Sequence, residues 1–268
     1  MPRPQPVLAD RKAPSRSIPG AVAIIPARLH STRLPEKPLQ DLGGAPLVVR
    51  VLEQVRASTT LRHVYVATDS TLIADAVTEA GGEVILTSPA HPTGLDRVAE
   101  ATRLLRETPD QDPEAVILNV QGDEPFVSRQ GLEHLLRLFL KPEVRMATLA
   151  APFDSLVEVV DPNRVKVLLD RNGRAIYFSR APIPSGYGPD AEPLHHVGVY
   201  GYRRQTLLDL AALGPAPIER AERLEQLRAL WNGIPIHVAV GDYFSIGIDT
   251  PEDLYRARTY WGEGRSTT

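Results

Sequence analysis

The chain of 268 residues contains no cysteine. It therefore cannot form a disulfide, a thiolate nucleophile or a cysteine-based zinc site, and any metal must be bound by oxygen or imidazole ligands. The absence fits a reducing compartment, and we expect a cytoplasmic protein. The sequence also has no run of about 18 apolar residues, the length that a membrane-spanning helix needs, so we expect no membrane partner.

A large charge excess is missing as well. The 30 Lys and Arg residues nearly balance the 33 Asp and Glu residues, which leaves a net charge of −3. Proteins that bind the phosphate backbone of nucleic acids need a basic excess, so we predict no nucleic-acid partner. The first residues lack the apolar segment of a secretory signal, and we interpret 1–17 as a disordered tail and 263–268 as a frayed end. Residues 18–262, in a chain that is 43% hydrophobic, can form one domain.

The first half of the chain alternates between short β-branched runs and amphipathic stretches. Strands are predicted at Val22 to Ile25, Val64 to Thr68, Glu83 to Leu86 and Ala115 to Val120. Helices are predicted at Pro46 to Ala57, Thr71 to Ala80, Asp96 to Glu107 and Ser128 to Leu140. This alternation indicates right-handed βαβ units and an α/β fold whose Rossmann-like sheet is mostly parallel and flanked by helices.

The pattern changes at Asn163. Two apolar runs flank Asn172-Gly173, which predicts a β-hairpin elaboration over about 163–184 with positive φ angles at its turn. A strand VGVYGY, helices from Arg204 to Leu213 and Ile218 to Asn232, and a strand IPIHVAV follow. In the last predicted helix, Thr250 is the N-cap and Pro251 the first helical residue.

The most informative segment is IIPARLHSTRLPEKPL, from Ile24 to Leu39. Its apolar strand should end at Pro26, so the loop that follows lies at a carboxyl edge, where α/β sheets bind ligands. Arg28 and Arg33 can each donate two hydrogen bonds to phosphate oxygens, and Lys37 adds a compact charge. The loop therefore suggests a polyphosphate site, although basic loop residues are more often only solvated surface.

Two aspartates are candidate metal ligands. Asp123 follows the apolar strand AVILNV and should lie beside the basic loop. A carboxylate next to a triphosphate needs a hard cation between them, and Mg²⁺ takes one or two carboxylates together with substrate phosphates. From the residues alone, an Asp that caps a turn is an equally good interpretation of Asp123. Asp249, by itself, would be interpreted as a helix cap.

The same segment resembles the signature of nucleotidyltransferases that activate acidic sugars with CTP, and most closely the 3-deoxy-manno-octulosonate cytidylyltransferase family. Further matches follow in family order from about Val22 to Tyr260: VATDS at Val66, AGGEVILTS at Ala80, TGLDRVAEA at Thr93, NVQGDEPFV at Asn119, NRVKVLLD at Asn163, YFSRAPIP at Tyr177, HHVGVYGYR at His195, LEQLRALW at Leu224 and GIDTPEDL at Gly247. The resemblance thus covers nearly the whole chain.

The resemblance implies transfer of CMP from CTP to the anomeric hydroxyl of a 2-keto-3-deoxy sugar acid, with release of pyrophosphate, for the biosynthesis of lipopolysaccharide-type surface sugars. It implies catalytic roles for Arg28, Lys37, Asp123 and Asp249, and Mg²⁺ bound by Asp123 and Asp249. It also implies CTP contacts from Pro26, Ala27, Arg28, Arg33 and Lys37, and sugar contacts from Arg97, Gln121, His196, Tyr200, Glu225 and Gln226.

The resemblance further implies a homodimer, and the hairpin residues Val165, Val167, Ile176 and Phe178 exceed what one sheet face would bury. Two departures from the family pattern leave the identity of the acidic sugar open: Leu95 replaces a Thr or Ser, and Ser245-Ile246-Gly247-Ile248 replaces a Gly-Thr-Gly pattern. A cytidylyltransferase for sialic acid or another nonulosonate is therefore an alternative. A second alternative is a nucleotide-binding module without catalysis.

Overall fold

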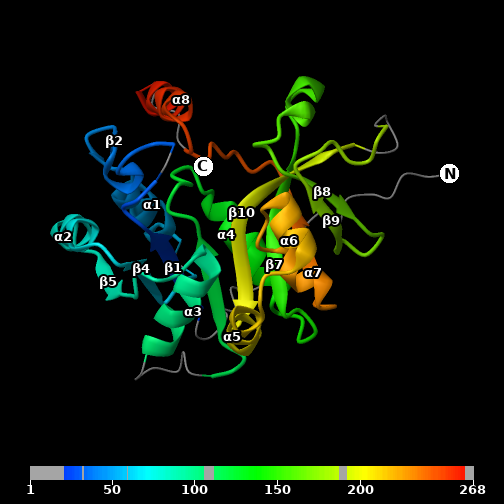
Figure 1. The fold of residues 1–268 in the computed structure, drawn as a ribbon, viewed down its shortest axis with the longest axis horizontal. Coiled ribbons are helices and arrows are strands. Elements are labelled where there is room, and N and C mark those ends of the chain that lie inside the picture. Colours follow the sequence, from blue (N-terminus) through cyan, green and yellow to red (C-terminus); the bar gives the residue numbers. More distant parts are fainter. Residues whose placement is uncertain (1–20, 32, 59, 106–111, 187–191, 263–268) are drawn as a thin grey trace.

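The computed structural model describes residues 21–31, 33–58, 60–105, 112–186 and 192–262. The expected tails at 1–17 and 263–268 lie outside the described residues. Seven strands form the path of the main sheet (Figure 1). In spatial order they are β11 (Ile236–Val240), β7 (Met146–Pro152), β10 (Leu194–Arg203), β6 (Val116–Val120), β1 (Val22–Ala27), β4 (His63–Thr68) and β5 (Glu83–Leu86).

The sheet is mostly parallel, as the sequence predicts, because β10 is the one strand of this path that runs against its neighbours. Helices cover both faces. The first face carries α1 (Leu47–Arg56), α2 (Thr71–Glu79) and α4 (Arg129–Leu138). The second carries α3 (Gly94–Leu104), α5 (Arg204–Ala212) and α7 (Leu227–Trp231).

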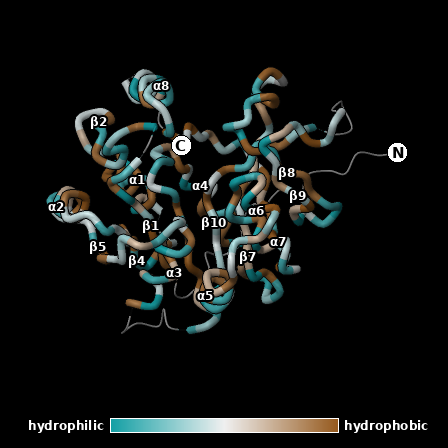
Figure 2. Tube along the Cα trace, viewed as in Figure 1, coloured by the Kyte–Doolittle hydropathy of each residue, from teal (hydrophilic) through white to brown (hydrophobic). Residues whose placement is uncertain are grey.

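The central strands are buried on both sides because their side chains alternate between the two helix layers. In β1, Ala23 and Ile25 belong to the core beneath the first layer, whereas Val22 and Ile24 belong to the core beneath the second. Figure 2 shows apolar residues along the central strands, β1 and β4 among them. This double burial explains the unbroken apolar runs by which the sequence identifies these strands.

Smaller elements surround the sheet. They are the 3₁₀ turns η1 (Lys37–Leu39) and η3 (Leu156–Val160), the strands β2 (Asp41–Leu42) and β3 (Ala45–Pro46), the hairpin strands β8 (Lys166–Leu169) and β9 (Ala175–Ser179), and the helices α6 (Pro217–Glu222) and α8 (Pro251–Gly262). Helix α8 packs near β2, so the C-terminal helix lies beside an early segment of the chain (Figure 1). Within the described residues, no helix is both long and apolar enough to cross a membrane.

Two expected features are wrong in detail, and one strand was missed. Pro26 lies inside β1 rather than ending it, because pairing with β6 stops at Ile24 and leaves Pro26 with β4 as its partner. The helix expected over 218–232 is interrupted at Arg223, whose φ of 56° is left-handed and separates α6 from α7. Strand β7 was not expected, although the sheet requires it between β11 and β10.

The predicted hairpin is confirmed, since β8 and β9 pair antiparallel. Gly173 alone takes the positive φ at the turn, at 74°, so Asn172 does not share it as the sequence suggested. Of the apolar residues that were expected to exceed one face, Val167 and Phe178 are buried within the chain, as is Val165. Ile176 alone is exposed, at 53%, which weakens the sequence argument for a dimer.

Candidate active site

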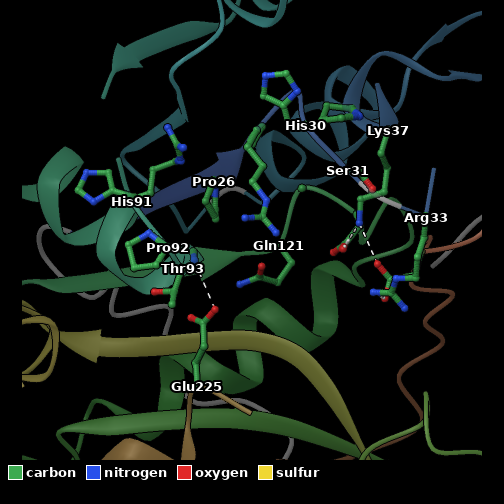
Figure 3. A pocket seen from close by; sticks show the side chains of 18 residues that line it. Pro26, His30, Ser31, Arg33, Lys37, His91, Pro92, Thr93, Gln121 and Glu225 are labelled. Atoms are coloured by element: carbon green, nitrogen blue, oxygen red, sulfur yellow. Dashed lines mark hydrogen bonds and ion pairs between the residues drawn. The ribbon is translucent and has the colours of Figure 1, made fainter. Parts of the chain in front are cut away.

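A cavity of about 600 Å³ opens at the carboxyl ends of β1 and β6. Its walls come from the basic loop after β1, the turn after β6 and the N-terminus of α3. Figure 3 shows Arg33 and Lys37 on one side of it, His91 and Thr93 on the other, and Gln121 between them. All five residues that were expected to bind CTP line this cavity: Pro26, Ala27, Arg28, Arg33 and Lys37.

Lys37 lies at the centre of the charged groups. Its Nζ is 2.7 Å from Asp123 Oδ2 and 3.0 Å from Asp249 Oδ1. Burial lowers the pKa of Lys37, but attraction to the two carboxylates outweighs this effect, so its pKa is raised. Arg33 adds a second cation, with Nη2 at 3.0 Å from Asp249 Oδ2. Lys37 therefore stays charged and holds the two aspartates near one point.

The turn that carries Asp123 depends on a glycine. The amide of Glu124 donates to the carbonyl of Gln121 at 3.1 Å, which closes the turn directly after β6. A Cβ at Gly122 would lie 2.8 Å from the carbonyl oxygen of Pro26, closer than real Cβ atoms come to backbone. Gly122 thus lets the Asp123 turn lie against the end of β1.

Asp249 reaches the same point from the segment between β11 and α8. A capping box fixes the start of α8, because Thr250 Oγ1 accepts from the amide of Asp253 and Asp253 Oδ2 accepts from the amide of Thr250. Burial raises the pKa of the Asp249 carboxyl, but Lys37 and Arg33 outweigh it and hold that pKa below its usual value. Asp249 is therefore ionised at neutral pH, as a metal ligand must be.

The donor set fits Mg²⁺. Two carboxylates converge on a single positive charge, and oxygen ligands are those that this ion prefers. Among the described residues, no group of three or more His, Cys, Asp or Glu could hold a metal by itself. A metal held by Asp123 and Asp249 would hence complete its shell with water and substrate oxygens.

Glu124 is a neighbour that the sequence analysis did not single out. Burial and the adjacent carboxylate of Asp123 raise the pKa of Glu124 to about 7, while a hydrogen bond from Ser245 Oγ opposes that shift. Its side chain lines a second cavity of about 200 Å³, which shares Asp123 and Asp249 with the first cavity. The only sequence signal was its place beside Asp123 in QGDE.

Arg97 lines the first cavity, yet its side chain is only 4% exposed. Its Nη1 donates to Thr87 Oγ1 at 2.6 Å. Its Nη2 lies 3.2 Å from Asp69 Oδ1, which is ion-pair distance without good hydrogen-bond geometry. The guanidinium thus joins α3 to the segments after β4 and β5, which supports a structural role in the cavity wall, while the expected contact with a sugar carboxylate stays a prediction.

Glu225 and Gln121, two other expected sugar contacts, also lie on this cavity. The carboxylate of Glu225 accepts from the amide of Gly94 at 3.3 Å (Figure 3) and from the amide of Leu95 at 3.1 Å, both at the start of α3. Negative charge at a helix N-terminus is favourable, so Glu225 stabilises the α3 end of the site. Gln121 donates to Asn119 Oδ1 at 3.1 Å.

The remaining expected sugar contacts do not line the first cavity. His196 borders the second cavity, and Tyr200 and Gln226 border a small buried space behind Glu225. His196 and Tyr200 are buried with ring centroids 5.3 Å apart, and Thr148 Oγ1 lies 3.0 Å from His196 Nε2. The Nε2 of Gln226 is buried without a hydrogen-bond partner. The structure therefore brings together the expected nucleotide residues but divides the expected sugar residues.

His91 and Thr93 line the first cavity without having been predicted. Thr93 is the N-cap of α3, and His91 Nε2 lies 2.5 Å from Glu100 Oε2. Thr93 as an N-cap and Glu100 within α3 are ordinary features of a helix. Capping rules therefore predict the helix, but they do not predict that His91 and Thr93 face the cavity.

The burial of His196 makes stability depend on pH. Burial, with a smaller contribution from His195, lowers the pKa of His196 to about 3 from 6.5. Below pH 6.5 the unfolded chain binds a proton at His196 and the folded protein does not. The stabilisation of the folded state by neutral His196 is therefore complete above pH 6.5 and is lost as the pH falls. Between pH 7 and 5 we expect a loss of about 2 kcal/mol from this residue.

Urea unfolding of the wild type and of His196→Gln at pH 7 and pH 5 measures that loss. The glutamine variant has no proton to bind, so its free energy of unfolding should fall by about 2 kcal/mol less over this interval. An equal fall in both proteins would show that His196 does not carry the pH dependence.

The α/β sheet and its charged carboxyl edge define a nucleotidyltransferase-type site. The sequence profile of the cytidylyltransferase family matches residues 22–236. The chain is 46% identical over 258 residues to 3-deoxy-manno-octulosonate cytidylyltransferase of Polynucleobacter necessarius, covering 93% of this chain and 97% of that protein. The 3-deoxy-manno-octulosonate cytidylyltransferase of Rhodospirillum centenum is also 46% identical, over 240 residues that cover 88% of this chain and 91% of that protein.

Solved structures agree. A CMP:2-keto-3-deoxy-manno-octonic acid synthetase in complex with CTP has a TM-score of 0.82 at 36% identity, covering 91% of this chain and 99% of that one. A 4-diphosphocytidyl-2C-methyl-D-erythritol synthase from Anaerococcus prevotii, at 14% identity and a TM-score of 0.59, shares the fold. The chain belongs to the cytidylyltransferase family, within its 3-deoxy-manno-octulosonate cytidylyltransferase group.

Proposed function

We propose that this protein transfers CMP from CTP to the anomeric hydroxyl of 3-deoxy-manno-octulosonate, giving CMP-3-deoxy-manno-octulosonate and pyrophosphate for lipopolysaccharide biosynthesis. The observation that carries the proposal is the convergence of Lys37, Asp123 and Asp249 at the strand ends of a cytidylyltransferase fold. The relatives named for this reaction match nearly the whole chain.

In the proposed reaction, the first cavity holds the nucleotide. Arg28 is exposed there and makes no ion pair with any described residue, so its guanidinium is available to the triphosphate. Lys37 and Arg33 lie at the aspartates, where their positive charges can stabilise the negative charge of the departing pyrophosphate. The backbone of Pro26 and Ala27, at the end of β1, borders the same cavity and suits recognition of the base.

Transfer of a phosphoryl group depends mainly on positioning and on neutralisation of developing negative charge. Asp123 and Asp249 are the residues that would hold Mg²⁺, which would supply electrostatic stabilisation of the α-phosphate and favour ionisation of the attacking hydroxyl. His196 is buried with a strongly lowered pKa, so it stays neutral and suits positioning of the sugar rather than proton transfer.

A pyrophosphate-release assay tests the function. CTP with 3-deoxy-manno-octulosonate and Mg²⁺ should give the highest kcat/KM in a panel that includes sialic acid, other nonulosonates and the other nucleoside triphosphates. Preference for another acidic sugar would replace the sugar assignment but retain the reaction. Absence of pyrophosphate release with every pair would contradict catalysis itself.

We also propose a homodimer, which the family resemblance implies. Ile176 on β9 and Val157 in η3 are 53% and 79% exposed, as interface residues of an isolated chain would be. Light scattering at micromolar concentration should give twice the mass of the chain, and a monomer mass would contradict this proposal.

A further inference from the structure

Asp249 lies on a segment without helix or strand, between β11 and α8. Such a segment does not hold a carboxylate in place by its own backbone pattern. Yet Asp249 must meet Asp123, which belongs to a different part of the chain, if both are to bind one ion. The contacts that fix this segment are therefore part of the site.

Two hydrogen bonds join the segment to the turn after β6, beside the apolar packing of Phe244 and Ile248 with Phe126. The amide of Ile248 donates to the carbonyl of Asp123 at 3.0 Å. The hydroxyl of Ser245 donates to Glu124 Oε2 at 2.5 Å. This second bond runs between two side chains and links the residues before Asp249 to the turn through the carboxyl group of Glu124.

The other oxygen of Glu124 is enclosed by two glycines. A Cβ at Gly198 in β10 would lie 3.3 Å from Glu124 Oε1, and one at Gly247 would lie 3.4 Å from it. The distance at Gly198 is shorter than an ordinary contact and the distance at Gly247 is at its lower limit. Neither position therefore has room for a side chain. The carboxyl group of Glu124 thus fills a fitted space between the backbone of β10 and the backbone of the Asp249 segment.

We infer that Glu124 is a positioning residue, whose bond with Ser245 and contact at Gly247 hold the Asp249 segment so that Asp249 faces Asp123 across Lys37. The inference rests on the proposed function, because that reaction is what requires both aspartates. Glu124 itself lies on the second cavity, and among the described residues Lys37 pairs with Asp123 and Asp249 rather than with Glu124. It acts through the backbone that carries Asp249.

The test uses the full chain with Glu124→Ala, Glu124→Gln and Ser245→Ala. Glu143→Ala is the matched control, because Glu143 is exposed and precedes the start of β7, at the opposite edge of the sheet. The first readout is amide hydrogen exchange of peptides that contain Ile248, measured without substrates. The second is the Mg²⁺ concentration that gives half-maximal pyrophosphate release, and circular dichroism checks the fold of each variant.

In Glu124→Ala we expect about tenfold faster exchange at Ile248 and an approximately tenfold higher half-saturating Mg²⁺ concentration, the factor that ~1.4 kcal/mol produces. Ser245→Ala should shift both in the same direction. Glu124→Gln keeps an acceptor for Ser245 and should stay close to the wild type, as should Glu143→Ala.

Unchanged exchange and unchanged Mg²⁺ dependence in Glu124→Ala would overturn the inference. A glutamine variant as impaired as the alanine variant would also overturn it, since charge rather than positioning would then be the requirement. If Glu124→Ala fails to fold, Ser245→Ala decides between the same outcomes. A wild type that releases no pyrophosphate would count against the proposed function alone, because exchange is measured without turnover.

Discussion

Replacing Asp123 or Asp249 by alanine is expected to lower turnover by roughly 10²- to 10³-fold while the protein keeps its fold. Loss of one charge contact in a transition state is worth about 3 to 4 kcal/mol. Neither aspartate is a core side chain: the side chains are 28% and 44% exposed. Steady-state pyrophosphate release and circular dichroism, measured on the same preparations, separate loss of chemistry from loss of structure.

These variants also change Lys37. Burial lowers the pKa of Lys37 and the two carboxylates raise it, so removal of either carboxylate should bring this pKa down. Asp154→Ala is the matched control, since Asp154 is exposed on the chain after β7. Turnover close to the wild type at saturating Mg²⁺ in Asp123→Ala or Asp249→Ala would remove that residue from the proposed metal site.

Arg97→Ala is expected to raise KM for both CTP and the acidic sugar and to lower stability. The substitution leaves Asp69, whose side chain is 16% exposed, without its ion-pair partner and Thr87 without its donor. Removing one member of a buried pair costs about 3 to 5 kcal/mol, and the partial exposure of Asp69 places the expected loss at or below the lower end. A KM increase of about 10- to 150-fold corresponds to loss of one charge-assisted bond.

The control is Arg103→Ala, an exposed arginine in the last turn of α3. Substrate-dependence curves and urea unfolding distinguish the two roles open to Arg97. A KM increase confined to the sugar, with unchanged stability, would assign Arg97 to the sugar carboxylate. A loss of stability with both KM values raised would assign it to the cavity wall.

The main sheet could be predicted because β1 and β6 are buried on both faces and β4 is mostly buried, so these strands consist mainly of apolar, largely β-branched residues. Strand β7, MATLAAP, was missed because its three alanines carry little β-propensity, and tertiary pairing with β10 and β11 decides its conformation. The break at Arg223 was missed because no Gly or Pro marks it.

Motif position predicted that Asp123 would lie beside the loop that carries Lys37, because residues that follow parallel strands meet at one edge. The place of Asp249 beside them followed only from the family resemblance, since its own sequence context indicates a helix cap. The place of Arg97 could not be predicted in this way. Its partners, Asp69 and Thr87, follow two other strands, and sequence spacing does not reveal whether a guanidinium turns toward a cavity or toward its wall.

The position of β10 has a consequence for folding. This strand lies between β6 and β7 and pairs with both, although it follows both in the sequence. A chain emerging from the ribosome therefore presents β6 and β7 with unpaired edges until residues 194–203 have been made. Open edges are templates for pairing with other chains, and long-range strand pairing is slow. Insertion of β10 pairs the facing edges of β6 and β7 and brings His196 to the second cavity, so one strand both covers two edges that could pair with other chains and lines a cavity beside the two aspartates.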